Sequence, residues 1–99
     1  MNNLRVNIPE RVMKDLHEFA YKNGIKKIIL FGSRARNEHY KKSDIDIAVS
    51  GGDFDSFYWD VHEHVHSLLM FDIIDLNSEI PAELKNEISK DGILIYEKI

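Results

Sequence analysis

The apolar positions of the chain follow two spacings, and their alternation predicts the order of helices and strands. The first stretch repeats apolar residues at intervals of three and four, at Val12, Leu16, Phe19 and Ala20. This spacing places them on one face of a helix. Pro9 suits the first turn of that helix because its missing N–H is not needed there, and Asn23-Gly24 is a typical helix end.

The rest of the chain continues this alternation. Residues 26–31 form a short apolar run typical of a buried strand, and residues 44–49 alternate so that Ile45, Ile47 and Val49 share one face. A short helical turn is expected between these two strands. Further elements are expected as a helix over 54–70, a strand over 71–76, a helix over 81–90 and a strand over 93–96. This order predicts one α/β or α+β domain over residues 1–99, with helices packed around a single sheet.

The helix expected over residues 54–70 has an unusually wide apolar face. Its buried stripe is expected to centre on Phe54, Tyr58, Val61 and Val65. A second row follows at helical spacing along the flank, at Trp59, His62, His66 and Met70. We interpret this row as a partner interface, although Trp59 could instead pack over the edge of the sheet. The spacing of His62 and His66 also fits a zinc pair, but such a pair needs a third ligand, which the pattern does not supply.

Composition narrows the class of protein. With 43% hydrophobic and 30% charged residues, the chain resembles an ordinary globular domain. It has no cysteine, which excludes disulfides, thiolate catalysis and cysteine zinc sites. Its longest apolar runs are far shorter than the roughly 18–20 residues that span a bilayer, and its first residues lack the apolar core of a signal peptide. We therefore expect a cytoplasmic protein with no membrane segment.

Charge is segregated along the chain. The net charge of −4 argues against a general nucleic-acid binder. Residues 26–42 contain six basic residues and one acidic residue, whereas residues 43–84 contain ten carboxylates and no Lys or Arg. A basic strip beside an acidic field could serve a phosphate-bearing ligand together with a divalent cation, although a polar surface can also segregate by sign without any ligand.

The candidate chemistry lies between the first two strands. Asp44 and Asp46 are two residues apart on a strand, so their side chains project from the same face and can converge on one or two divalent ions. Gly32 follows the preceding strand, and its lack of a Cβ would let a phosphate approach the backbone. Ser33 and the following amides would open a helical turn that favours an anion. Arg34 and Arg36 would then lie beside the phosphates, although either can be an ordinary exposed arginine.

A third carboxylate is expected from the strand over residues 71–76. Asp72 and Asp75 are three residues apart and therefore point to opposite faces, so only one of them can join Asp44 and Asp46. An aspartate in an apolar strand is costly unless a metal or a partner offsets its charge. We choose Asp72 over Asp75 as a metal ligand that also takes a proton from an attacking hydroxyl.

These motifs together resemble the DNA polymerase beta type nucleotidyltransferase superfamily, and most closely its minimal nucleotidyltransferase (MNT) domains. The resemblance covers nearly the whole chain. It is carried by Phe31-Gly32-Ser33-Arg34-Ala35-Arg36, by Ser43-Asp44-Ile45-Asp46, by Asp72-Ile73-Ile74-Asp75 and by the closing Gly92-Ile93-Leu94-Ile95-Tyr96. Asn37 departs from the glycine that often follows the Arg-x-Arg, a mild departure because Asn tolerates left-handed backbone angles.

The resemblance implies a mixed sheet of about four strands flanked by helices, the nucleotidyltransferase fold. It also implies that Gly32 and Ser33 hold the β and γ phosphates, that Asp44 and Asp46 bind two Mg²⁺ ions, and that Asp72 assists the acceptor hydroxyl. The implied reaction moves NMP from an NTP, most often AMP from ATP, and releases pyrophosphate.

The acceptor is expected outside this domain, because 99 residues suffice for one sheet and the phosphate loop but hardly for a second substrate site. The resemblance implies a separate helical protein of the HEPN type, with which MNT domains often form a toxin and antitoxin pair. Two alternatives stay open at this point. The chain could neutralise or scaffold a helical protein by contact alone, or it could modify a small molecule such as an antibiotic.

Overall fold

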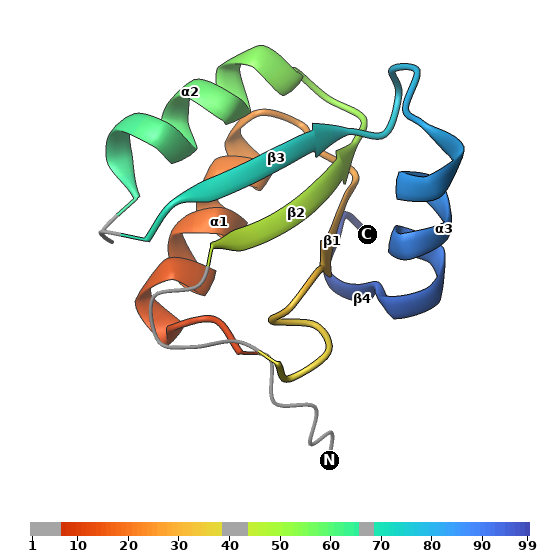
Figure 1. Cartoon of the computed structure of the whole chain (residues 1–99). Coiled ribbons are helices and arrows are strands. Elements are labelled where there is room, and N and C mark those ends of the chain that lie inside the picture. The colour runs from red at the N-terminus through yellow and green to blue at the C-terminus, as the bar shows by residue number, and fades with distance from the viewer. Residues whose placement is uncertain (1–6, 39–43, 66–68) are drawn as a thin grey trace.

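The expected alternation of helices and strands is present in the computed structural model, which describes residues 7–38, 44–65 and 69–99 (Figure 1). The elements in chain order are α1 (Glu10–Lys22), β1 (Lys27–Phe31), β2 (Ile45–Ser50), α2 (Phe54–His64), β3 (Phe71–Asp75), α3 (Ala82–Asp91) and β4 (Ile93–Glu97). Residues 33–37 form hydrogen-bonded turns in place of the expected short helix. No helix within the described ranges is long and apolar enough to cross a membrane.

The four strands form one mixed sheet in the order β3-β2-β1-β4. β1 lies in the centre and runs antiparallel to both β2 and β4, whereas β2 and β3 are parallel. A parallel pair needs a long crossover connection, and α2 provides it between β2 and β3. The mixed sheet with flanking helices confirms the expected fold class.

Helices cover both faces of the sheet. One face packs against α1 and α2, and the side chains of β2 that point to it are Ile45, Ile47 and Val49, all fully buried. The opposite face packs against α3, where Phe31, Ala48 and Ile88 form a second, smaller core. Because strand side chains alternate between faces, Asp46 lies on the α3 face together with Ala48.

The second helix is shorter than the sequence pattern predicts. α2 ends at His64, and Val65 already has an extended backbone with φ −70° and ψ 135°. A helix reaching residue 70 would leave no connection before β3, which begins at Phe71. The buried face also differs from the prediction, since Phe57 is fully buried while Tyr58 is 43% exposed. Met70 therefore lies outside the helix, directly before β3.

Candidate functional site

Asp46 stands at the meeting point of three strands on the α3 face of the sheet. The sheet register pairs it with Phe31 of β1 on one side and with Asp72 of β3 on the other. Register partners of neighbouring strands point to the same face and lie roughly 5 Å apart at the backbone, so the carboxylates of Asp46 and Asp72 project side by side. Asp44 directly precedes β2 and is exposed.

Asp75 does not share this position. It pairs with Val49, a residue of the α1–α2 face, and its Oδ1 accepts a hydrogen bond of 2.9 Å from the backbone N–H of Asn77. This carboxylate therefore shapes the turn after β3. Of the two aspartates weighed in the sequence, Asp72 is the one that lies beside Asp46.

The loop after β1 approaches Asp46 through Gly32, the residue that follows the strand. Gly32 has φ +77°, and a Cβ added to it would lie only 2.2 Å from Oδ2 of Asp46. Any side chain here would therefore displace the carboxylate, quite apart from the strain of the left-handed backbone. The turn that follows is closed by hydrogen bonds of 3.0 and 3.2 Å from the N–H groups of Ala35 and Arg36 to the Gly32 carbonyl.

Partial burial and like charges act together on Asp46. Desolvation, followed by the neighbouring carboxylates of Asp72, Asp44 and Glu87 in that order, raises the pKa of its carboxyl to about 6, although Arg36 opposes them. Within the described ranges, no three His, Cys, Asp or Glu side chains are arranged closely enough to hold a metal ion as they stand. The acids are close enough to repel one another but are not gathered around a single point.

Arg36 links the loop to α3. Its Nε lies 2.9 Å from Oε1 of Glu38, and its Nη1 lies 3.4 Å from Oδ2 of Asp91 and 3.6 Å from Oε2 of Glu87. The arginine is about one-third exposed, so it stays accessible from solvent. The roles of Glu87 and Asp91 were missed in the sequence, although two acids four residues apart on one helix face could have indicated a shared basic partner.

Arg34 has a different environment from the one expected beside a phosphate. It is 4% exposed, and its Nη1 donates a hydrogen bond of 2.7 Å to the backbone carbonyl of Asn7. The side-chain amide of Asn7 donates in turn to the Arg34 carbonyl and to Oδ1 of Asn37. Burial lowers the pKa of Arg34. Arg34 thus fastens the start of α1 to the loop, and Asn37 adopts the left-handed φ of +61° that its side chain tolerates.

The basic strip found in the sequence is divided in space. Lys26 and Lys27 lie at the start of β1, whereas the register partner of Asp46 is Phe31 at its end. Four strand steps separate these ends by roughly 13 Å. The expectation that one basic strip lies against the carboxylates is therefore wrong for these two lysines, whereas Lys41 and Lys42 lie outside the described residues. Among the basic side chains that the structure describes, Arg36 is the one whose charge lowers the pKa of Asp46.

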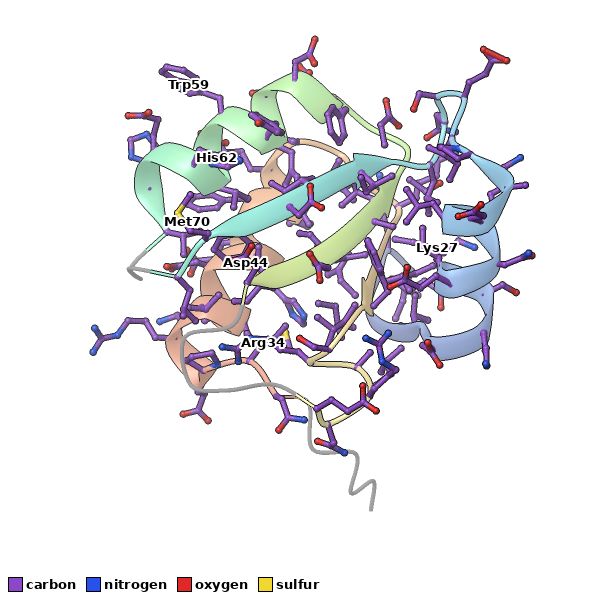
Figure 2. The ribbon with its side chains drawn as sticks, in the orientation of Figure 1. Lys27, Arg34, Asp44, Trp59, His62 and Met70 are labelled. Atoms are coloured by element: carbon purple, nitrogen blue, oxygen red, sulfur yellow. The ribbon has the colours of Figure 1, made fainter. Side chains whose placement is uncertain are left out.

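The expected interface row is partly assembled. Trp59 is 61% exposed on α2, and Met70 is 65% exposed directly before β3 (Figure 2). His62 contacts Tyr58 with ring centroids 4.3 Å apart. His66 lies outside the described residues. Because Met70 is not on the helix, the row is not a single helical stripe, but exposed apolar side chains do flank α2.

A family model described as "Polymerase beta, Nucleotidyltransferase" matches residues 14–99 of the chain. Two relatives from Methanocaldococcus jannaschii carry the name putative protein adenylyltransferase. One is 31% identical over 94 residues, which cover 95% of this chain and 83% of that relative. The other is 58% identical over 36 residues, a match that spans only 35% of this chain and 36% of that relative.

Solved structures share the fold at lower identity. A chain from a toxin-antitoxin crystal structure with AMP-PNP superposes with a TM-score of 0.68 at 24% identity, covering 87% of this chain and 73% of that chain. A second structure holds the tri-AMPylated HEPN toxin of Shewanella oneidensis in complex with an MNT antitoxin. The similar chain in it has a TM-score of 0.60 at 23% identity, covering 87% of this chain and 70% of its own length.

Proposed function

The chain belongs to the polymerase beta nucleotidyltransferase family, and from that membership we propose that it transfers the AMP group of ATP to a hydroxyl of a partner protein. The observation that carries the proposal is the grouping of Gly32, Asp46 and Asp72 at one end of the sheet. The backbone of Gly32 lies against the carboxylate of Asp46, which gives a triphosphate a loop that it can approach closely. The carboxylate of Asp72 lies beside Asp46 on the next strand, where it can act on an attacking hydroxyl.

The loop after β1 receives the triphosphate in this proposal. Gly32 allows close approach of the backbone, and Ser33 adds a hydroxyl beside it for the β and γ phosphates. Arg36 exchanges its contacts with Glu87 and Asp91 for the phosphate oxygens, for which its partial exposure leaves room. Arg34 stabilises the loop through its hydrogen bond to the backbone carbonyl of Asn7.

Asp44, Asp46 and Asp72 would hold magnesium. Carboxylate oxygens are the ligands that this hard cation prefers, and the mutual repulsion and partial burial that raise the pKa of Asp46 would be relieved by a bound cation. The donor set therefore fits the metal that the family implies. When bound, two Mg²⁺ ions would neutralise the triphosphate and activate the attacking oxygen.

Asp72 is the proposed general base that deprotonates the acceptor hydroxyl. Its carboxylate is exposed, so an acceptor from another molecule can reach it. Asp72 takes the proton of the acceptor hydroxyl while that oxygen bonds to the α phosphorus. The bond from the α phosphorus to the bridging oxygen breaks, and pyrophosphate leaves.

We further propose that the acceptor is a helical HEPN-type protein and that the chain acts as the antitoxin of the pair. The names of the relatives and of the solved structures support a protein acceptor of this kind. The exposed side chains of Trp59, His62 and Met70 are the proposed contact surface. A cytoplasmic location agrees with the need for a nucleoside triphosphate.

The test is the intact mass of a co-expressed helical partner after incubation with ATP and Mg²⁺. We expect an increase of one or more AMP groups with the wild type and none with Asp44→Asn. If the two proteins form a tight complex while the mass of the partner stays unchanged, the chain acts by contact alone and the proposed transfer is wrong. Pyrophosphate release that depends on an added small molecule would instead indicate antibiotic-type modification.

A further inference from the structure

Four carboxylates lie on α2 or at its cap, and only two of them have partners within the fold. Asp53 caps the helix by accepting a hydrogen bond of 3.1 Å from a backbone N–H of the first turn. Asp60 is buried, and its Oδ2 lies 3.3 Å from Nζ of Lys22. Asp55 and Glu63 are exposed, and neither forms an ion pair with any of the residues that the structure describes. The contacts of the fold therefore account for the first pair of carboxylates and not for the second.

Glu63 also stands at the less favourable end of the helix. α2 ends at His64, so the carboxylate of Glu63 lies in the last turn, where the helix dipole favours a positive charge. Asp55 lies in the first turn, where a negative charge suits the dipole. A positive group bound from outside would offset the unfavourable position of Glu63.

Trp59 lies between these two carboxylates on the surface of the helix. Asp55, Trp59 and Glu63 are four residues apart in succession, so their side chains are neighbours along one face. Trp59 is the one tryptophan of the chain, is 61% exposed and points away from the sheet (Figure 2). Tyr58 and His62 lie next to it on the helix, with their ring centroids 4.3 Å apart. We call these five side chains the outer face of α2.

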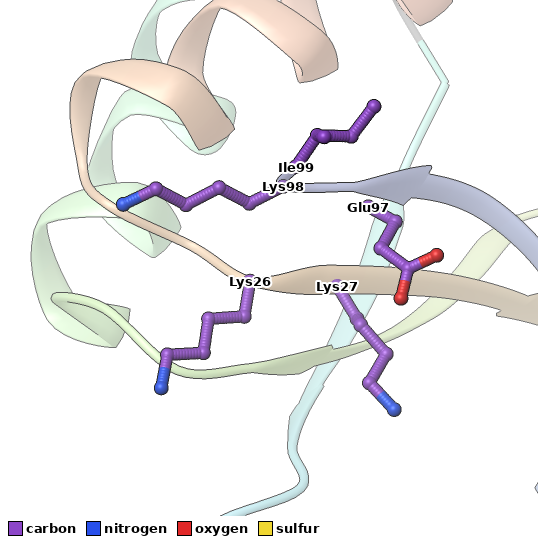
Figure 3. A pocket seen from close by; sticks show the side chains of 5 residues that line it. All are labelled: Lys26, Lys27, Glu97, Lys98 and Ile99. Carbon is purple, nitrogen blue, oxygen red and sulfur yellow. The ribbon is translucent and has the colours of Figure 1, made fainter.

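The charge of the outer face of α2 is not balanced by the rest of the described chain. Residues 43–84 contain no Lys or Arg. Lys26, Lys27 and Lys98 lie around the start of β1, where their side chains point apart (Figure 3), and none of them forms an ion pair with the outer face. An aromatic centre between two unpaired carboxylates complements a basic surface and would repel the phosphates of a nucleic acid.

We propose that the outer face of α2 binds an arginine on the surface of the partner protein, with the guanidinium stacked on Trp59 and paired with Asp55 or Glu63. A guanidinium is planar, so it can stack on an aromatic ring and donate two parallel hydrogen bonds to a carboxylate at the same time. A lysine ammonium supplies the charge without the planar face. This inference rests on the proposed function for the existence of a protein partner, and it adds the chemistry that the partner must present.

The single tryptophan makes this binding directly measurable. The probe is the peptide acetyl-hexa-arginine amide, titrated at low salt in EDTA while the emission of Trp59 is recorded, and acetyl-hexalysine amide is the probe of equal charge. We expect a saturable change in emission and a Kd at least about threefold lower for the arginine peptide. Asp55→Asn/Glu63→Gln should raise that Kd about tenfold, since each exposed charged contact contributes about threefold. Equal Kd values for the two peptides would overturn the assignment to arginine.

A matched control keeps the loss of charge the same. Glu79→Gln/Glu83→Gln removes two exposed carboxylates from α3 and the segment before it, on the other side of the sheet. Its Kd for the arginine peptide should stay within about twofold of the wild type. Equal weakening in both double variants would show attraction to net charge alone and would overturn the proposal.

AMP transfer to the helical partner separates this inference from the proposed function. Asp55→Asn/Glu63→Gln should raise the KM for the partner about fivefold or more and leave the KM for ATP within about twofold. An unchanged KM for the partner would overturn the docking surface while the proposed function stands. If the wild type transfers no AMP but Trp59 responds to the arginine peptide as expected, the proposed function is wrong and the outer face of α2 keeps its assignment.

Discussion

Asp46 of β2 and Asp72 of β3 are register partners on adjacent parallel strands, so two acids of like charge lie side by side on one face of the sheet. Such a pair is destabilising on its own, and the half-burial of Asp46 adds to the cost. A scaffold would gain stability by replacing either residue. In the proposed function, the pair is unfavourable in the unliganded protein and becomes favourable once a cation is bound.

Removing the charge of Asp46 should stabilise the metal-free protein. The pKa of Asp46 is raised from 3.8 to about 6 in the folded state, so the folded protein holds a proton that the unfolded chain has lost. The stability should then fall as the pH rises from about 4 to 6 and stay reduced above that range. Asp46→Asn should raise the free energy of unfolding by about 1–2 kcal/mol at about pH 7.5, a figure reduced for the partial exposure of the carboxyl.

Urea unfolding in EDTA at about pH 4 and about pH 7.5 measures this effect. The difference between Asp46→Asn and the wild type should nearly vanish at the lower pH, where both forms are neutral at this position. Added Mg²⁺ should stabilise the wild type and leave the variant almost unaffected. A wild type that is more stable than Asp46→Asn at neutral pH without metal would contradict the account.

The two aspartates of β3 should differ sharply in their effect on transfer. Asp72→Asn removes the carboxylate beside Asp46 and should reduce kcat by about 100-fold or more. Asp75→Asn changes a residue on the other face that shapes a turn, and its kcat should stay within about threefold of the wild type. Steady-state pyrophosphate release measures both. Equal losses in the two variants would show that the register does not select the functional residue.

Gly32 should tolerate no side chain. Gly32→Ala forces a Cβ to within 2.2 Å of Oδ2 of Asp46, so we expect loss of transfer together with a destabilisation of about 1–3 kcal/mol. Gly24→Ala is the matched control, because it has a similar φ of +69° but its Cβ would meet no atom closer than 3.9 Å. It should lower stability without lowering kcat. Transfer at the wild-type rate by Gly32→Ala would exclude the proposed phosphate loop.

Substitution of Arg34 should mainly lower stability, whereas substitution of Arg36 should mainly weaken the binding of ATP. Arg34→Gln removes a buried side chain that anchors Asn7 and should lower the free energy of unfolding by about 2–3 kcal/mol. Arg36→Gln removes an exposed ion-pair centre and should change stability by less than about 1 kcal/mol while raising the KM for ATP about tenfold. Unfolding curves and ATP kinetics on both variants decide the assignment, and the reverse pattern would exchange the two roles.

Much of this site could be predicted from local pattern. The two-residue period of a strand puts Asp44 and Asp46 on one side, and the apolar run before Gly32 indicates a strand that ends there. The choice between Asp72 and Asp75 cannot be made from the local sequence pattern. It depends on how β3 is aligned with β2, and a slip of one residue would bring the other face of β3 to the site.

Other features depend on contacts between distant parts of the chain. Arg34 and Arg36 look equivalent in the sequence, and only the packing of the segment around Asn7 buries one of them. Glu87 and Asp91 meet Arg36 because α3 packs against the end of β1, which no local pattern encodes. The early end of α2 likewise follows from the position of β3 and not from any helix-breaking residue, since residues 65–70 contain neither Gly nor Pro.

The central claim is that this chain moves the α phosphate of a nucleoside triphosphate to a partner protein. Incubation of the two proteins with Mg²⁺ and ATP labelled either at the α or at the γ phosphate tests it most directly. The account predicts that the α label becomes covalently attached to the partner, that the γ label leaves as pyrophosphate, and that Asp72→Asn abolishes the attachment while Asp75→Asn preserves it. Attachment of the γ label, or of neither label in a stable complex, would contradict it.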